Sequence, residues 1–94
     1  MNELEKQYCE NLYKAILKLE TVDDCRKFFE DICTIKEVLD ISQRLEVANL
    51  LSNGKNYQEV SKATGASTAT ISRVSRCLNY GSGGYKLVVK KDED

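Results

Sequence analysis

The sequence predicts an all-helical fold, and two of its features support this prediction. Proline is absent, and glycines cluster only beyond residue 80, so little before that point would interrupt a helix. Apolar residues recur at three- and four-residue intervals, as on one face of an amphipathic helix. The 94 residues suffice for one domain at most. The core of so short a chain must be packed efficiently or be completed by a partner chain.

The first two helices are expected over residues 3–19 and 22–32. The apolar face of the first consists of Leu4, Tyr8, Leu12, Ala15, Ile16 and Leu19. Thr21 precedes the second helix and can cap it, since Asp24 follows three residues later. The apolar face of the second helix consists of Val22, Cys25, Phe28, Phe29 and Ile32.

A third helix is expected to begin after Thr34, because Thr34 and Glu37 have the spacing of a capping box. Asn53 and Gly54 are expected to end it as a left-handed glycine cap does. Its apolar residues surround much of its circumference, namely Val38, Leu39, Ile41, Leu45, Val47, Ala48, Leu50 and Leu51. A helix of this kind is buried on more than one side. In so small a domain, the additional face is expected to contact a second subunit.

The end of the chain is expected to leave the helical core. Gly81-Ser82-Gly83-Gly84 is typical of a flexible linker. Residues 85–91 are expected to form a short edge strand or a disordered tail. The expected organisation is therefore a helical dimerisation core over residues 1–80, followed by a glycine-rich linker and a flexible or strand-like tail over residues 81–94.

The formal net charge of −1 conceals an asymmetry along the chain. Residues 1–50 carry seven Lys or Arg and eleven Asp or Glu, whereas residues 51–91 carry seven Lys or Arg and one acid, Glu59. The last three residues are acidic and restore the balance. The second half is thus locally basic, as a polyanion partner requires, although a solvated basic surface without a partner explains the charge equally well.

Several function classes are not favoured. Histidine is absent, which removes the commonest general base and metal ligand, and no phosphate-binding G-x-x-x-x-G-K motif occurs. The four cysteines include no C-x-x-C pair, so we expect reduced, buried, small apolar side chains and neither a metal site nor a cofactor. No apolar run approaches a membrane span, and the polar, acidic N-terminus is not a signal peptide. We expect a cytoplasmic protein that is not an enzyme.

The most informative segment is residues 57–79, which predicts a helix-turn-helix. Short helices are expected at 57–64 and 67–79, joined through Gly65-Ala66-Ser67. The motif requires inward apolar residues, a small residue where the helices cross, and a glycine in the turn. These requirements are met by Val60, Ile71 and Val74, by Ser61, and by Gly65.

The outward face of this segment is suited to DNA. Short hydroxyl and methyl side chains together with arginines can enter a major groove. Ser67 can cap the second helix, whose N-terminus favours phosphate. The residues expected to bind DNA are Gln58, Ser61, Lys62, Ser67, Thr68, Ala69, Thr70, Ser72, Arg73 and Arg76. The alternative is a plain helical hairpin without a DNA-binding role.

Residues 31–78 resemble the Trp repressor superfamily, and most closely its YerC/YecD-type branch. The resemblance is carried by Thr34, by Gln43-Arg44, by Leu50-Leu51 with Gly54, and by Gly65-Ala66-Ser67-Thr68-Ala69-Thr70-Ile71-Ser72-Arg73. It implies an all-helical, intertwined homodimer that presents two reading heads to double-stranded DNA with a roughly palindromic operator. The tail departs from the family, in which a C-terminal helix helps to close the dimer.

The resemblance also implies an amino-acid corepressor pocket. Arg44 and Arg73 match two arginines that sandwich the ligand, and Thr34 matches a threonine at its carboxylate. Three positions depart from the tryptophan-binding pattern: Val74 replaces a glycine, Cys77 replaces a serine, and Asp31 adds a carboxylate. These departures indicate a smaller or more polar amino acid, such as histidine, or no effector.

The sequence therefore predicts a sequence-specific DNA-binding transcriptional regulator. We expect a repressor that responds to an amino acid other than tryptophan and is associated with the nucleoid when bound to DNA. Two alternatives stay open: a helical dimeric adaptor, and a small-molecule sensor that acts through protein partners.

Overall fold

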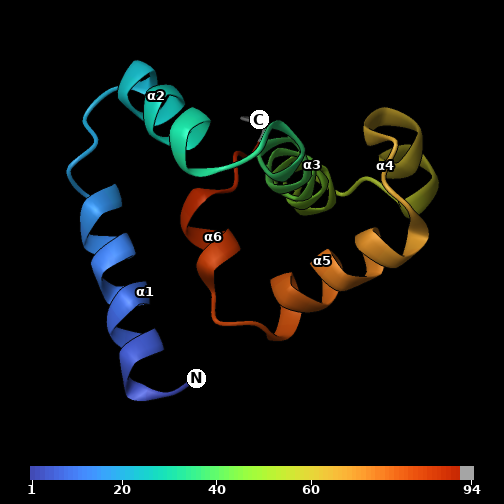
Figure 1. Ribbon diagram of the computed structural model, residues 1–94. Coiled ribbons are helices and arrows are strands. Elements are labelled where there is room, and N and C mark those ends of the chain that lie inside the picture. Colours follow the sequence, from blue (N-terminus) through green and yellow to red (C-terminus); the bar gives the residue numbers. More distant parts are fainter. Residues whose placement is uncertain (92–94) are drawn as a thin grey trace. The chain divides into compact units, whose positions relative to one another are not determined.

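The computed structural model describes residues 1–91, in which every regular element is a helix. The elements are α1 (Glu3–Ile16), α2 (Val22–Ile32), α3 (Ile35–Ser52), α4 (Tyr57–Thr64), α5 (Thr68–Tyr80) and α6 (Gly84–Val88), labelled in Figure 1. The expectation of an all-helical fold is confirmed. No helix in this part of the chain is long and apolar enough to cross a membrane.

The chain divides into two compact units at the boundary between Val38 and Leu39, within α3. The helical dimerisation core expected over residues 1–80, with its helix-turn-helix at residues 57–79, therefore includes parts of both units. The physical reason lies in burial, because neither α1 nor α2 contains a buried residue. The buried apolar side chains of the described residues all come from the second unit.

Local hydrogen bonds set the helix ends in the first unit. Asn2 begins α1 with a capping box, in which its side chain accepts from the Glu5 N–H at 2.8 Å and Glu5 accepts from the Asn2 N–H at 3.0 Å. The helix ends at Ile16, earlier than expected, because the N–H groups of Lys18 and Leu19 turn to carbonyls three residues back. The Thr21 hydroxyl caps α2 as expected, accepting from the Asp24 N–H at 3.0 Å.

The start and the end of α3 also follow the sequence-based expectation. Thr34 and Glu37 form the reciprocal capping box, with distances of 2.8 Å and 3.1 Å between their donors and acceptors. Hydrogen bonds from the backbone and then the side chain of Thr34 lower the pKa of Glu37. After Ser52 the chain turns at Gly54, whose φ of 84° is left-handed.

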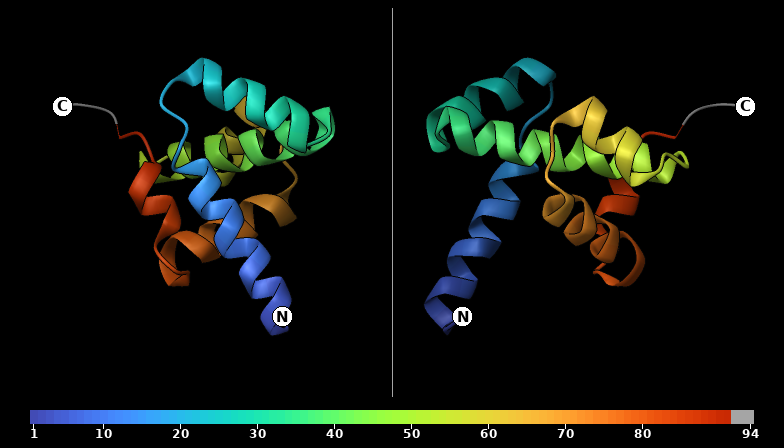
Figure 2. Two further views of the ribbon diagram at one scale, coloured as in Figure 1. Left: turned by 60° about the vertical axis from the view of Figure 1, so that its left-hand side comes forward. Right: turned by 90° about the vertical axis from the view of Figure 1, so that its right-hand side faces the viewer.

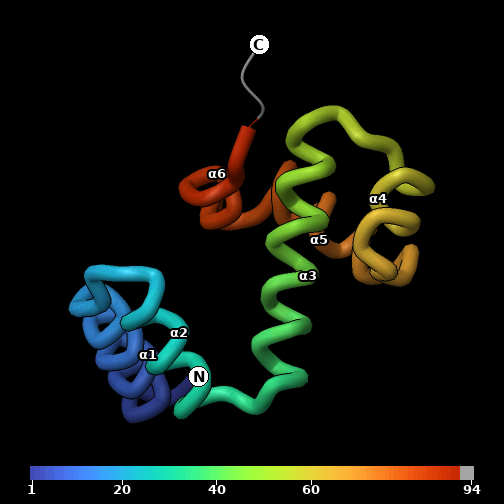
Figure 3. The backbone as a smooth tube through the Cα atoms, turned by 90° about the horizontal axis from the view of Figure 1, so that it is seen from above, coloured from blue at the N-terminus to red at the C-terminus, as the bar shows by residue number. Residues whose placement is uncertain are grey.

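A small apolar core organises the second unit. Its buried residues are Val47 and Ala48 of α3, Val60 of α4, Ala66 of the turn, and Ile71 and Val74 of α5. The second half of α3 lies over α5, with α4 on one side and α6 on the other (Figures 1 and 3). The three apolar positions expected to anchor the helix pair therefore do face the core.

The C-terminal segment is a correction to the expected strand or flexible tail, because Gly84–Val88 forms helix α6. Tyr85 and Val89 stand four residues apart, as helix neighbours on one face do, and both pack against the core. The Val89 N–H donates to the Tyr85 carbonyl at 2.9 Å. Packing against the core thus overrides the weak local preference of this segment.

The cysteines are a second correction. They were expected to be buried, yet Cys25 and Cys77 are exposed, and Cys9 and Cys33 are half-buried. All four thiols are free. None of them belongs to the small core of the second unit.

Gly65 offers a test of the turn between α4 and α5. Its φ of 73° is left-handed, and a Cβ placed there would meet no atom within 4 Å. Gly65→Ala is therefore expected to lower the free energy of unfolding by about 1 kcal/mol through backbone strain alone. Urea unfolding followed by circular dichroism would measure this. Gly84→Ala, equally open but without positive φ, should not destabilise; equal losses in both variants would contradict the explanation.

Candidate functional site

The turn between α4 and α5 is held by short polar contacts. Gly65 caps α4, and its N–H donates to the Ser61 carbonyl at 2.8 Å. The Ser61 hydroxyl donates to the Ala66 carbonyl at 3.0 Å, so this residue, expected to bind DNA, braces the turn. The Thr64 hydroxyl accepts from the Ala66 N–H at 3.1 Å. Figure 2 shows the two helices meeting at this turn.

The N-terminus of α5 is capped by Ser67, as expected. Its hydroxyl oxygen accepts from the Thr70 N–H at 3.1 Å, and the two hydroxyl groups are also 3.1 Å apart. Thr70 is half-buried, and its hydroxyl is hydrogen-bonded to the capping residue Ser67. The earlier N–H groups of this first turn stay available to an anion such as a phosphate.

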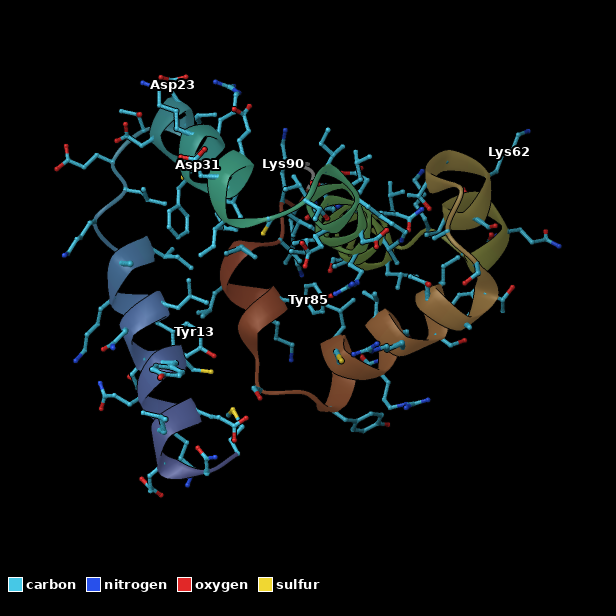
Figure 4. All side chains as sticks on the ribbon, in the orientation of Figure 1. Tyr13, Asp23, Asp31, Lys62, Tyr85 and Lys90 are labelled. Carbon is cyan, nitrogen blue, oxygen red and sulfur yellow. The ribbon has the colours of Figure 1, made fainter. Side chains whose placement is uncertain are left out.

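Beyond the cap, α5 presents a polar face to solvent. Thr68, Ala69, Arg73 and Arg76 are exposed and Ser72 is half-buried. On α4, Gln58 and Lys62 are exposed too, and Figure 4 shows Lys62 pointing away from the helices. Three ion pairs, Lys6 with Glu3, Arg26 with Asp23 and Lys27 with Asp23, lie within α1 and α2 and away from this face.

A cavity of about 310 Å³ lies beside this face, between α3, α5 and α6. It is lined by Asp40, Gln43, Arg44, Thr70, Arg73, Val74, Cys77 and Tyr85. Three residues expected to bind an effector meet here: Arg44, Arg73 and Cys77. The other two, Asp31 and Thr34, belong to the first unit, and Figure 4 labels Asp31 on α2.

Sequence reasoning missed three of the lining residues. Asp40 stands one helical turn before Arg44, and Gln43 stands directly before Arg44. Helical spacing from Arg44 could therefore have predicted Asp40 as a lining residue. Tyr85 had no such signal, because its segment was expected to be extended. Gln43 also ties α3 to α4, as its side-chain N–H donates to the Thr64 carbonyl at 3.1 Å.

The chemistry of the cavity suits a small anion-bearing ligand. The half-buried Arg44 and the exposed Arg73 line the same space from α3 and α5, and paired guanidinium groups bind a carboxylate well. Asp40 contributes the opposite charge on the α3 side. Because Arg73 belongs both to this cavity and to the exposed face of α5, a ligand here would contact a residue that also faces solvent.

Comparison with known proteins identifies the family. The family model of the Trp repressor protein matches residues 7–93. The chain belongs to the Trp repressor family. The uncharacterized protein YerC of Bacillus subtilis (strain 168) is 44% identical over 91 residues, spanning 97% of this chain and 88% of YerC. The resemblance seen in the sequence is thus confirmed.

Two crystal structures of bacterial relatives share the fold of this Trp repressor family protein. A TrpR-like protein from Eubacterium eligens ATCC 27750 superposes with a TM-score of 0.85 at 52% identity, covering 93% of this chain and 90% of that one. A Staphylococcus aureus protein proposed to be a Trp repressor gives 0.83 at 41% identity, with the same coverage. The Trp repressor family is a family of DNA-binding regulators and not of enzymes.

Proposed function

We propose that the protein is a sequence-specific DNA-binding repressor of transcription that works as a homodimer. The observation that carries this proposal is the exposed face of α5, with Thr68, Ala69, Arg73 and Arg76 open to solvent beside a capped N-terminus. Short hydroxyl and methyl groups fit the major groove, and arginines can contact guanine edges or phosphates. The locally basic second half of the chain supplies the electrostatic attraction.

The homodimer is supported by the apolar surface that the single chain leaves exposed. Tyr8, Val22 and Ile35 are 61%, 75% and 82% exposed, and they lie on three successive helices. Neither α1 nor α2 has a buried residue, although each has an apolar face. A second copy that covers these faces would complete a core too small for a single chain. Two copies of α5 would then read half-sites one DNA turn apart.

The cavity beside α5 supports an effector role. We propose that it binds an amino acid other than tryptophan, whose carboxylate is held by Arg44 and Arg73. Val74 stands where the family resemblance implies a glycine, and its buried side chain reduces the space. Cys77 is a poor hydrogen-bond acceptor for an amine. Asp31 and Thr34 remain proposed contributors, as does a cytoplasmic, nucleoid-associated location.

The test is to capture fragmented DNA of the source genome on the purified protein, with and without a pool of amino acids. We expect a few palindromic sites to be enriched, and their affinity to fall about 10³-fold between 50 and 200 mM salt, as for roughly six phosphate contacts. A changed enrichment with amino acids would support the effector. No enrichment in either condition, together with salt-independent binding, would contradict the proposal and favour a helical adaptor.

A further inference from the structure

Two asparagines, Asn49 of α3 and Asn53 directly after it, bind the backbone at Lys90, in the segment that follows α6. The Asn49 side-chain oxygen accepts from the Lys90 N–H at 2.8 Å, and the Asn53 side-chain N–H donates to the Lys90 carbonyl at 2.9 Å. Asn53 also donates to the Asn49 carbonyl at 2.8 Å. Both backbone groups of Lys90 are thereby satisfied by side chains one helical turn apart, and Figure 4 places Lys90 beside α3.

This attachment, together with the packing of Tyr85 and Val89 against the core, determines where α6 lies. Tyr85 is half-buried and points from α6 toward the space between α3 and α5 (Figure 4). It is the one residue of α6 that lines the cavity of about 310 Å³ among the described residues. The other lining residues come from α3 and α5 and are mostly charged or polar.

Tyr85 also lines a second hollow, of about 330 Å³, on its other side. That hollow is apolar, with Ile41 and Leu45 of α3 and Val88 of α6 in its walls. Arg44 and Tyr85 line both hollows, so the two hollows are neighbours that share these side chains. The polar cavity thus offers a place for a carboxylate, and the Tyr85 ring stands where this cavity meets an apolar hollow.

We infer that Tyr85 determines ligand specificity, so that the cavity accepts a small hydrophilic amino acid and excludes a bulky apolar one. Val74 and Tyr85 are the large apolar residues that line the cavity, so a bulky apolar side chain of a ligand bound to Arg44 and Arg73 would have to pack against one of them. Val74 is 1% exposed and belongs to the core, so it cannot yield without a loss of packing. Asn49 and Asn53 are positioning residues that hold the tyrosine in place. This inference rests on the proposed effector role of the cavity.

Removal of the ring is the direct test. Tyr85→Ala would join the two hollows and give a carboxylate-bound ligand an apolar extension. Isothermal titration with serine, asparagine and glutamate, and with leucine, phenylalanine and tryptophan, would measure affinity for each amino acid. The expected result is that the wild type prefers the hydrophilic set, and that Tyr85→Ala gains at least about tenfold in affinity for one or more of the apolar set.

Three further variants make the result decisive. Leu87→Ala is a matched control, since Leu87 lies on α6, is 85% exposed and lines neither hollow; it should keep the wild-type preference. Tyr85→Phe keeps the ring and should do the same. Asn49→Ala loosens Lys90 and should shift preference in the same direction as Tyr85→Ala, which provides a second test if that variant unfolds.

An unchanged preference in folded Tyr85→Ala and Asn49→Ala, or tight binding of the apolar set by the wild type, would overturn the inference. Binding of no amino acid by the wild type or either variant would also overturn it. DNA capture by the same samples separates the two proposals, because intact DNA binding would confine the failure to the effector cavity.

Discussion

Ala69→Asp is expected to reduce DNA affinity at least about 100-fold, which corresponds to about 3 kcal/mol. Ala69 is exposed in the first turn of α5, between the cap at Ser67 and the arginine at position 73. A carboxylate there would face the phosphates and base edges that this face is proposed to meet. Fluorescence anisotropy with an enriched DNA site would measure the loss.

Ala63→Asp is the matched control, because Ala63 is an exposed alanine of α4 outside the residues proposed to bind DNA. It makes the same change in net charge. Because it lies outside the proposed DNA-binding face, it should lower affinity far less. Circular dichroism melting would check that both variants fold. Equal affinities of the two variants would mean that net charge, and not the face of α5, governs binding.

Leu12→Asp is expected to weaken the dimer at least about 100-fold, because each copy would bury an unpaired carboxylate at a cost of several kcal/mol. Leu12 lies on the apolar face of α1 and is 38% exposed in the single chain, as is expected of a residue that becomes buried in the dimer interface. Sedimentation velocity over a range of protein concentrations would report the dissociation. DNA affinity should fall in parallel, since a monomer presents one reading head.

Asn11→Asp adds the same charge next to Leu12 and serves as its control. The Gln7 side chain donates to the Asn11 side-chain oxygen at 3.0 Å, and a carboxylate would accept that bond as well. This variant should stay dimeric. A monomeric wild-type protein, or a Leu12→Asp protein that sediments like Asn11→Asp, would refute the proposed dimer contact.

The helices could be predicted closely because their limits depend on nearby residues. The caps at Thr21, Thr34 and Ser67 each bond to a group three residues further on, and such pairs are visible in the sequence. The inward positions Val60, Ile71 and Val74 were likewise predicted, because helical periodicity assigns them to one face. The end of α1 was placed too late, since its apolar pattern continues through residues that form a tighter turn.

The sequence by itself thus determined the helical class, the capped ends, the buried face of the α4–α5 pair, and the family. Only the tertiary structure decided that the tail is a helix and that Tyr85 enters the cavity beside Arg44 and Arg73. The physical reason is distance along the chain. Lys90 is held by Asn49 across 41 residues, and contacts of that separation depend on packing that no local pattern encodes.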